Sequence, residues 1–181
     1  MQSAALSYRQ HARALLVLGV PLIGSHLAQI LIGVTDAVML GWYDVRALAA
    51  VTLGHSIFFV LFIVGSGFAF AVLPMVASAL AEGDETLVRR VTRMGLWLSA
   101  IYGAAVMPPL IWSGPVLLAL GREPETAAMA EDYLEIAAWG MIPGLAVMVL
   151  KNCLAALERT PAVLWITVVA AVLNAGLNYL L

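Results

Sequence analysis

The sequence contains a single cysteine, Cys153, and only 11% of its 181 residues are charged. One cysteine excludes an internal disulfide and offers no pair for zinc or redox chemistry. Soluble domains carry about 25% charged residues, so the low charge excludes an ordinary soluble domain. The chain also has no glycine-rich phosphate loop, no recognisable Ser/His/Asp set and no HExxH motif. These absences argue against an enzyme and against ATP-driven pumping by this chain.

Hydrophobic residues make up 63% of the chain, and the mean hydropathy is +0.99. Apolar runs of transmembrane length follow one another from end to end, which leaves no room for a soluble domain. The sequence therefore predicts an all-α integral membrane protein, a bundle of transmembrane helices. We expect a cytoplasmic lead-in at 1–13 and five spans at about 14–42, 47–80, 89–112, 127–157 and 162–181.

Prolines and acids predict where these helices bend, break or begin. Pro74 predicts a kink in the second helix, and the pair Pro108-Pro109 predicts a break near the end of the third. The fourth helix is expected to begin in the acidic turn at Glu131 and Asp132, a solvated N-terminus where acids suit the helix dipole. Before it, a loop at 113–126 has room for a short interfacial helix.

The basic residues indicate an orientation. Seven of the nine fall on one side of the predicted topology, which makes the N-terminus cytoplasmic by the positive-inside bias. These seven precede the first helix, follow the second, or lie between the fourth and fifth: Arg9, Arg13, Arg89, Arg90, Arg93, Lys151 and Arg159. Only Arg46 and Arg122 fall on the other side.

One acid, Asp36, lies inside the first apolar run. A carboxylate at that depth costs roughly 2.5–3.5 kcal/mol on insertion scales, so it is a candidate functional residue. Steps of three and four place four residues on one helix face: His26, Gln29, Gly33 and Asp36. A different interpretation has Asp36 near a helix end, reaching towards the membrane interface. His26 can titrate near neutral pH, but a lone histidine on a helix face is also a common packing residue.

The fifth helix carries a second polar set. Asn174 and Asn178 lie one turn apart on one face, and Thr167 extends that face. Two interpretations stay open. The amides can act as interhelical glue, worth on average about 0.6 kcal/mol per hydrogen bond. Alternatively, their oxygens help to surround Asp36, as a hydrogen-bonding shell or as ligands of a hard cation.

Three stretches resemble MATE (multidrug and toxic compound extrusion) transporters. QILIGVTDAVMLGWYDVRALAAVTLG is similar to their first helix and following loop, and LPMVASALAEGDETLVRR to the end of their second. AALERTPAVLWITVVAAVLNAGLNYLL resembles the junction of their fourth and fifth helices. The resemblance covers essentially the whole chain and implies twelve helices in two six-helix lobes. This chain would then be five helices of the N-terminal lobe, and its partner would be the C-terminal lobe that it lacks.

The resemblance also implies a mechanism, which is antiport of small organic, often cationic drugs against H⁺ or Na⁺ across the cytoplasmic (inner) membrane. Asp36 matches the family's cation-coupling acid, and Na⁺ is a possible ligand there. Asn174 and Asn178 match the asparagines beside that acid. Gln29, His26, Gly33 and Thr167 would support the cavity. Some archaeal and DinF-type members carry Asp where this chain has Asn178, a departure that points to a NorM-like member. The resemblance implies no cofactor apart from the coupling ion, and no nucleic-acid partner.

Two alternatives remain. A related flippase for lipid-linked sugars is expected to line its cavity with several basic residues, whereas all nine Lys and Arg here can be placed at helix ends or in loops. A non-transporting membrane scaffold would give Asp36 a purely structural role.

Overall fold

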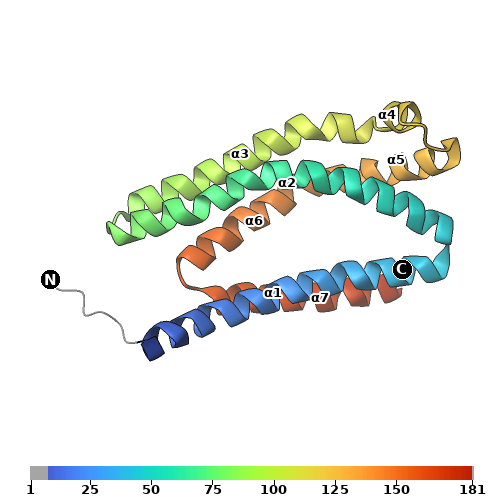
Figure 1. Cartoon of the computed structure of the whole chain (residues 1–181). Helices are drawn as coiled ribbons and strands as arrows, with labels where there is room; N and C mark the ends of the chain where they lie inside the picture. The colour runs from blue at the N-terminus through green and yellow to red at the C-terminus, as the bar shows by residue number, and fades with distance from the viewer. Residues whose placement is uncertain (1–7, 181) are drawn as a thin grey trace. The chain divides into compact units, whose positions relative to one another are not determined.

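The computed structural model describes residues 8–180, apart from the side chains at positions 10, 11, 14, 43, 178 and 180. Its helices are shown in Figure 1: α1 (Tyr8–Tyr43), α2 (Val45–Ala81), α3 (Glu85–Ile111), α4 (Gly114–Ala119), α5 (Pro124–Trp139), α6 (Met141–Ala156) and α7 (Thr160–Leu180). No strand occurs within residues 8–180. Four helices are long and apolar enough to span a membrane, and α5 with α6 forms a fifth candidate as a bent pair. The predicted all-α transmembrane bundle is confirmed.

Capping by an aspartate side chain explains where two helices, α2 and α3, begin. The Asp44 carboxylate accepts a hydrogen bond from the Arg46 backbone N–H at 3.0 Å, and the Asp84 carboxylate accepts one from Leu87 at 2.9 Å. Each cap satisfies a backbone donor that the first helical turn leaves open. The third helix therefore begins at Glu85, ahead of the predicted 89. Residues 8–13, predicted as lead-in, already belong to α1, because they contain no helix breaker. Residues 1–7 lie outside the described part.

The helices form two compact units. One contains α1 as far as Asp36 together with α7, and the other contains residues 37–157.

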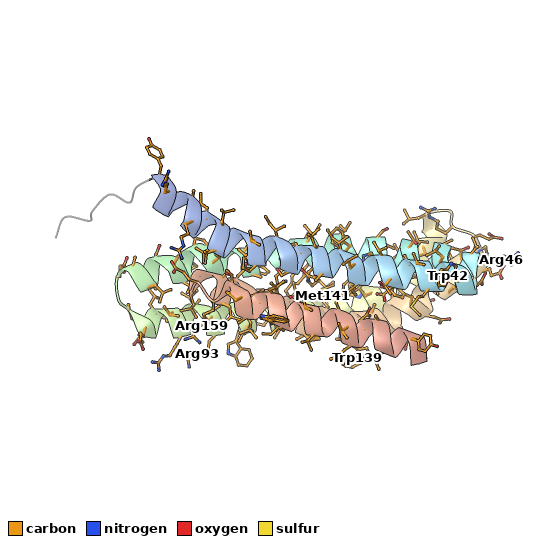
Figure 2. The ribbon with its side chains drawn as sticks, turned by 90° about the horizontal axis from the view of Figure 1, so that it is seen from below. Trp42, Arg46, Arg93, Trp139, Met141 and Arg159 are labelled. Atoms are coloured by element: carbon orange, nitrogen blue, oxygen red, sulfur yellow. The ribbon has the colours of Figure 1, made fainter. Side chains whose placement is uncertain are left out.

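In the unit of residues 37–157, α2 packs against α3, α5 and α6. Its core consists of three apolar clusters along α2. The first joins α2, α3 and α6: Ala69, Val72, Val76, Val91 and Val149. The second joins α3, α5 and α6: Leu110, Leu134, Ala138, Met141 and Leu145. The third joins α2, α4 and α5: Ala50, Leu117, Ala127 and Ala130. In Figure 2, Met141 lies between Arg93 and Arg46, which mark opposite ends of this unit.

The span predicted at 127–157 corresponds to two helices, α5 and α6, between which the chain bends by 47°. The break lies at Gly140, whose N–H donates a hydrogen bond to the Ala137 carbonyl at 2.8 Å. Pro143 supplies the reason. A proline has no N–H for the carbonyl four residues earlier, and its ring clashes with that carbonyl, here that of Trp139. Pro143 then sits in the first turn of α6, where a missing donor costs little.

The predicted break at Pro108-Pro109 is also wrong, since α3 continues to Ile111. A proline removes its own donor, but its carbonyl still accepts a hydrogen bond. The Pro108 carbonyl accepts from the Trp112 N–H at 3.0 Å, which closes the last turn of the helix. The expected short helix in the following loop is present as α4.

Candidate functional site

The polar stripe predicted on the first helix lies on α1, and all four of its residues are exposed: His26, Gln29, Gly33 and Asp36. Because α1 is continuous over them, their spacing keeps them on one face. The buried residues of α1 lie beside that stripe, with Ser25 0% and Ala28 8% exposed. Asp36 stands seven residues before the end of α1, a rise of about 10 Å. A short aspartate side chain does not span that distance, so reaching to the helix end is disfavoured.

A close contact fixes how α1 and α7 align. A Cβ built on Gly24 would lie 3.0 Å from Leu164 Cδ1, so the two helices touch there. Both figures show them running side by side in the same direction. Since α-helices rise equally per residue, Asp36 is level with position 176 along the shared axis. That level falls between Asn174 and Asn178.

The buried face of α7 carries two of the predicted residues. Thr167 is 7% exposed and donates its hydroxyl hydrogen to the Val163 carbonyl at 2.8 Å, within its own helix. Asn174, seven residues further along, is half-buried, and its Oδ1 is buried without a hydrogen-bond partner among the described residues. The Asn178 side chain lies outside the described residues, although its backbone continues α7.

A buried amide oxygen without a donor is costly in a membrane, because no water is present to satisfy it. Two chemical groups would relieve that cost at Asn174: a proton donor, such as a protonated carboxyl, or a hard cation. A cation bound there would complete its shell with carboxylate, amide, backbone or water oxygens. Among the described residues, no three His, Cys, Asp or Glu side chains are grouped to hold a metal ion.

Sequence reasoning missed a set of polar contacts on α6. The Asn152 amide donates to the Ala69 carbonyl of α2 at 2.9 Å. Next to it, Cys153 Sγ lies 3.4 Å from Thr92 Oγ1 of α3. These contacts tie α6 to two neighbouring helices. An asparagine within an apolar helix was the available signal, of the same kind that drew attention to Asn174.

Lys151 was counted among the basic residues between the fourth and fifth helices, although the predicted span 127–157 contains it, and that placement between helices is wrong. It belongs to α6, five residues before the end of that helix, and is partly buried. The sequence placed it near a loop because Glu158 and Pro161 mark the turn. The flanking residues are nevertheless compatible with helix up to Ala156, so nothing ends the helix earlier.

The predicted helix start at Glu131 and Asp132 is wrong as well. Pro124 begins α5, a position that suits proline because the first helical N–H is unpaired in any case. Glu131 thus lies in the middle of α5, partly buried, and its carboxylate accepts a hydrogen bond from the Gly114 N–H at 3.0 Å. This contact joins α5 to the start of α4. At the same end, Arg46 and Glu125 form an exposed ion pair at 3.3 Å.

We predict that Asn152→Leu lowers the free energy of unfolding by about 0.6–1.7 kcal/mol, from the average to the maximum for interhelical hydrogen bonds in membranes. The variant removes the donor to Ala69 while keeping a similar volume. Reversible unfolding of the protein in detergent micelles measures the change. Ser56→Ala is the control, because the Ser56 hydroxyl donates only within its own helix, to Thr52 at 2.7 Å. Equal unfolding free energies for the two variants would contradict the role of Asn152.

Known proteins resemble this chain over nearly all of its length. The family model described as MatE matches residues 21–180. A protein of Rhizobium meliloti (strain 1021) named "Probable multidrug resistance protein NorM" is 49% identical over 175 residues, 97% of this chain and 38% of the relative. Proteins with the same name from Agrobacterium fabrum and a Synechococcus species are 41% and 34% identical, covering 99% and 96% of this chain. The chain spans about 38% of the length of the relatives that it matches. No solved structure matches it.

Proposed function

Because this chain belongs to the MatE family, we propose that it is part of an antiporter that exports small organic drugs, often cationic, against H⁺ or Na⁺. The names of its relatives as multidrug resistance proteins support drug export. Its apolar helices support a multi-pass membrane protein. Ion coupling, the charge of the drug and the cytoplasmic membrane are parts of the proposal.

One observation carries the ion coupling, namely the position of Asp36 in α1. Among the described helices that singly reach membrane length, it is the only acid away from the terminal turns. Its level along the axis falls beside Asn174, whose Oδ1 is buried without a hydrogen-bond partner among the described residues. We propose that the carboxylate takes up the proton or Na⁺, and that the amide donates to the ionised acid or adds its oxygen to the cation.

The transport cycle requires a second lobe, because alternating access moves one half of a transporter against the other. We propose that the remaining length present in the relatives supplies this lobe, and that the N-terminus is cytoplasmic. The cluster of Arg89, Arg90 and Arg93 at the start of α3 supports that orientation.

The two alternative functions, a lipid-linked sugar flippase and a membrane scaffold, would require different features of the protein. A flippase for lipid-linked sugars needs several basic residues in its cavity, whereas Lys151 is the one basic residue that the described structure places well inside an apolar span. A membrane scaffold needs no ion flux. We propose that the protein has no enzymatic activity.

Proteoliposomes containing the full-length protein test the proposal. An imposed pH or Na⁺ gradient should drive saturable movement of ethidium, an organic cation, and an ionophore that collapses the gradient should stop it. Residues 1–181 alone should not transport, because the proposed cycle needs a second lobe. Ethidium movement at the same rate with and without either gradient would contradict the proposed antiport. Gradient-driven transport by residues 1–181 alone would contradict the need for a second lobe.

A further inference from the structure

One face of α3 carries a stripe of side chains that the proposed transport site does not use. The buried residues of α3 recur every four positions and face the other helices: Val91, Gly95, Ser99 and Gly103. The opposite face presents, in order along the helix, Arg90, Arg93, Trp97 and Ile101. Trp97 is 69% exposed and Ile101 63% exposed.

The two arginines of this stripe carry uncompensated charge. The neighbouring Arg89 pairs with Glu85 at 3.0 Å, and the Asp84 carboxylate is engaged as the cap of α3. No ion pair joins Arg90 or Arg93 to a carboxylate of the described residues. In Figure 2, the Arg93 side chain extends outward from this end of the helices. The two guanidinium groups are therefore available to bind an anion that is not part of this protein.

The order of the side chains matches the order of groups in a phospholipid. The arginines occupy the second and third turns of α3, Trp97 follows one turn later and Ile101 one turn after that, at about 5.4 Å per turn. Arginines bind phosphate oxygens with a fork of donors. Tryptophan favours the headgroup level of a bilayer, where its ring meets glycerol and the first acyl carbons. Ile101 then lies at the depth of the chains.

We propose that this face binds an anionic phospholipid, with its phosphate on Arg90 and Arg93 and its glycerol and upper acyl chain on Trp97 and Ile101. Charge selects the lipid class. A choline headgroup brings its own cation next to the arginines, whereas an anionic headgroup does not. Free phosphate would satisfy the arginines but leave Trp97 and Ile101 without a partner, so the apolar half of the stripe selects a lipid.

Native mass spectrometry of the full-length protein, extracted from equimolar phosphatidylglycerol and phosphatidylcholine, tests the proposal. The wild type should retain phosphatidylglycerol in preference to phosphatidylcholine. The double variant Arg90→Gln/Arg93→Gln should lower that preference about tenfold, because each arginine near a membrane surface contributes to anionic lipid binding. Trp97→Ala should lower the retention of phosphatidylglycerol with the arginines intact.

The matched control is Arg89→Gln/Arg122→Gln, which removes the same charge from two exposed positions outside the stripe. Its lipid preference should stay within twofold of the wild type. An equal loss in both double variants would overturn the proposal, because net charge alone would then explain retention. Unchanged retention in Arg90→Gln/Arg93→Gln, or equal retention of both lipids by the wild type, would overturn it too. The substituted side chains are exposed, so the variants should fold as the wild type does.

Discussion

Replacing Asp36 by asparagine is expected to lower ion-driven drug export by the full-length protein severely. The substitution keeps the shape of the side chain but removes the group that takes up a proton or binds Na⁺ by charge. Coupling between two ligands typically corresponds to a factor of 5–150, so we expect export against a gradient to fall about 10- to 100-fold. Drug binding to the purified protein, measured in the absence of a gradient, should change little, because the stripe on α1 keeps its polar character.

Asp132→Asn is the matched control for this variant. It makes the same chemical change at an exposed acid of α5 and should leave export near the wild-type level. Export by Asp36→Asn at the wild-type rate would show that Asp36 is structural, and the coupling residue would then have to lie elsewhere in the full-length protein.

A double-mutant cycle with Asn174→Ala separates the two roles open to that residue. If Asn174 serves the same ion as Asp36, the losses in ion-driven export should be strongly non-additive. If Asn174 only holds helices together, the variant should lower the stability and leave the ratio of ions to drug unchanged. The buried Oδ1 without a partner among the described residues favours the first outcome.

The sequence predicted the apolar helices well because membrane length and composition are local properties. It also predicted that the four stripe residues of α1 share a face, since that depends only on helix periodicity. Helix periodicity alone left open whether Asn174 lies level with Asp36 or only holds helices together. That alignment depends on Gly24 meeting Leu164, a contact between residues 140 positions apart.

The wrong predictions arose where local sequence signals favoured different structures. Glu131 and Asp132 are typical of a helix start. Pro124 and Glu125 are typical of one as well, and α5 begins at Pro124. The bend within the predicted span 127–157 falls at Gly140 and not at Pro143 itself, because the proline ring clashes with the carbonyl four residues before it. Asn152 was missed because its partner is a backbone carbonyl, which no side-chain pattern reveals.

Replacing Gly65 by alanine is expected to destabilise the protein although alanine is the better helix former. A Cβ at this position would lie 2.5 Å from Cε1 of Tyr102 and 3.0 Å from Cδ1 of Leu145. The Tyr102 ring can pack against α2 only because Gly65 has no side chain, and its hydroxyl donates to the Leu61 carbonyl at 2.7 Å. An added methyl group would push the ring away and break that hydrogen bond.

Gly67, two residues away on the same helix, is the matched control, since a Cβ there meets nothing within 4 Å. Gly67→Ala should therefore show only the helix-propensity gain of up to about 1 kcal/mol. Gly65→Ala gains the same term but adds overpacking, about 1–3 kcal/mol, and the loss of a hydrogen bond, about 1 kcal/mol. Unfolding in detergent micelles should thus place Gly65→Ala about 2–4 kcal/mol below Gly67→Ala. Equal stability of the two variants would show that α2 and α3 do not meet through the Tyr102 ring.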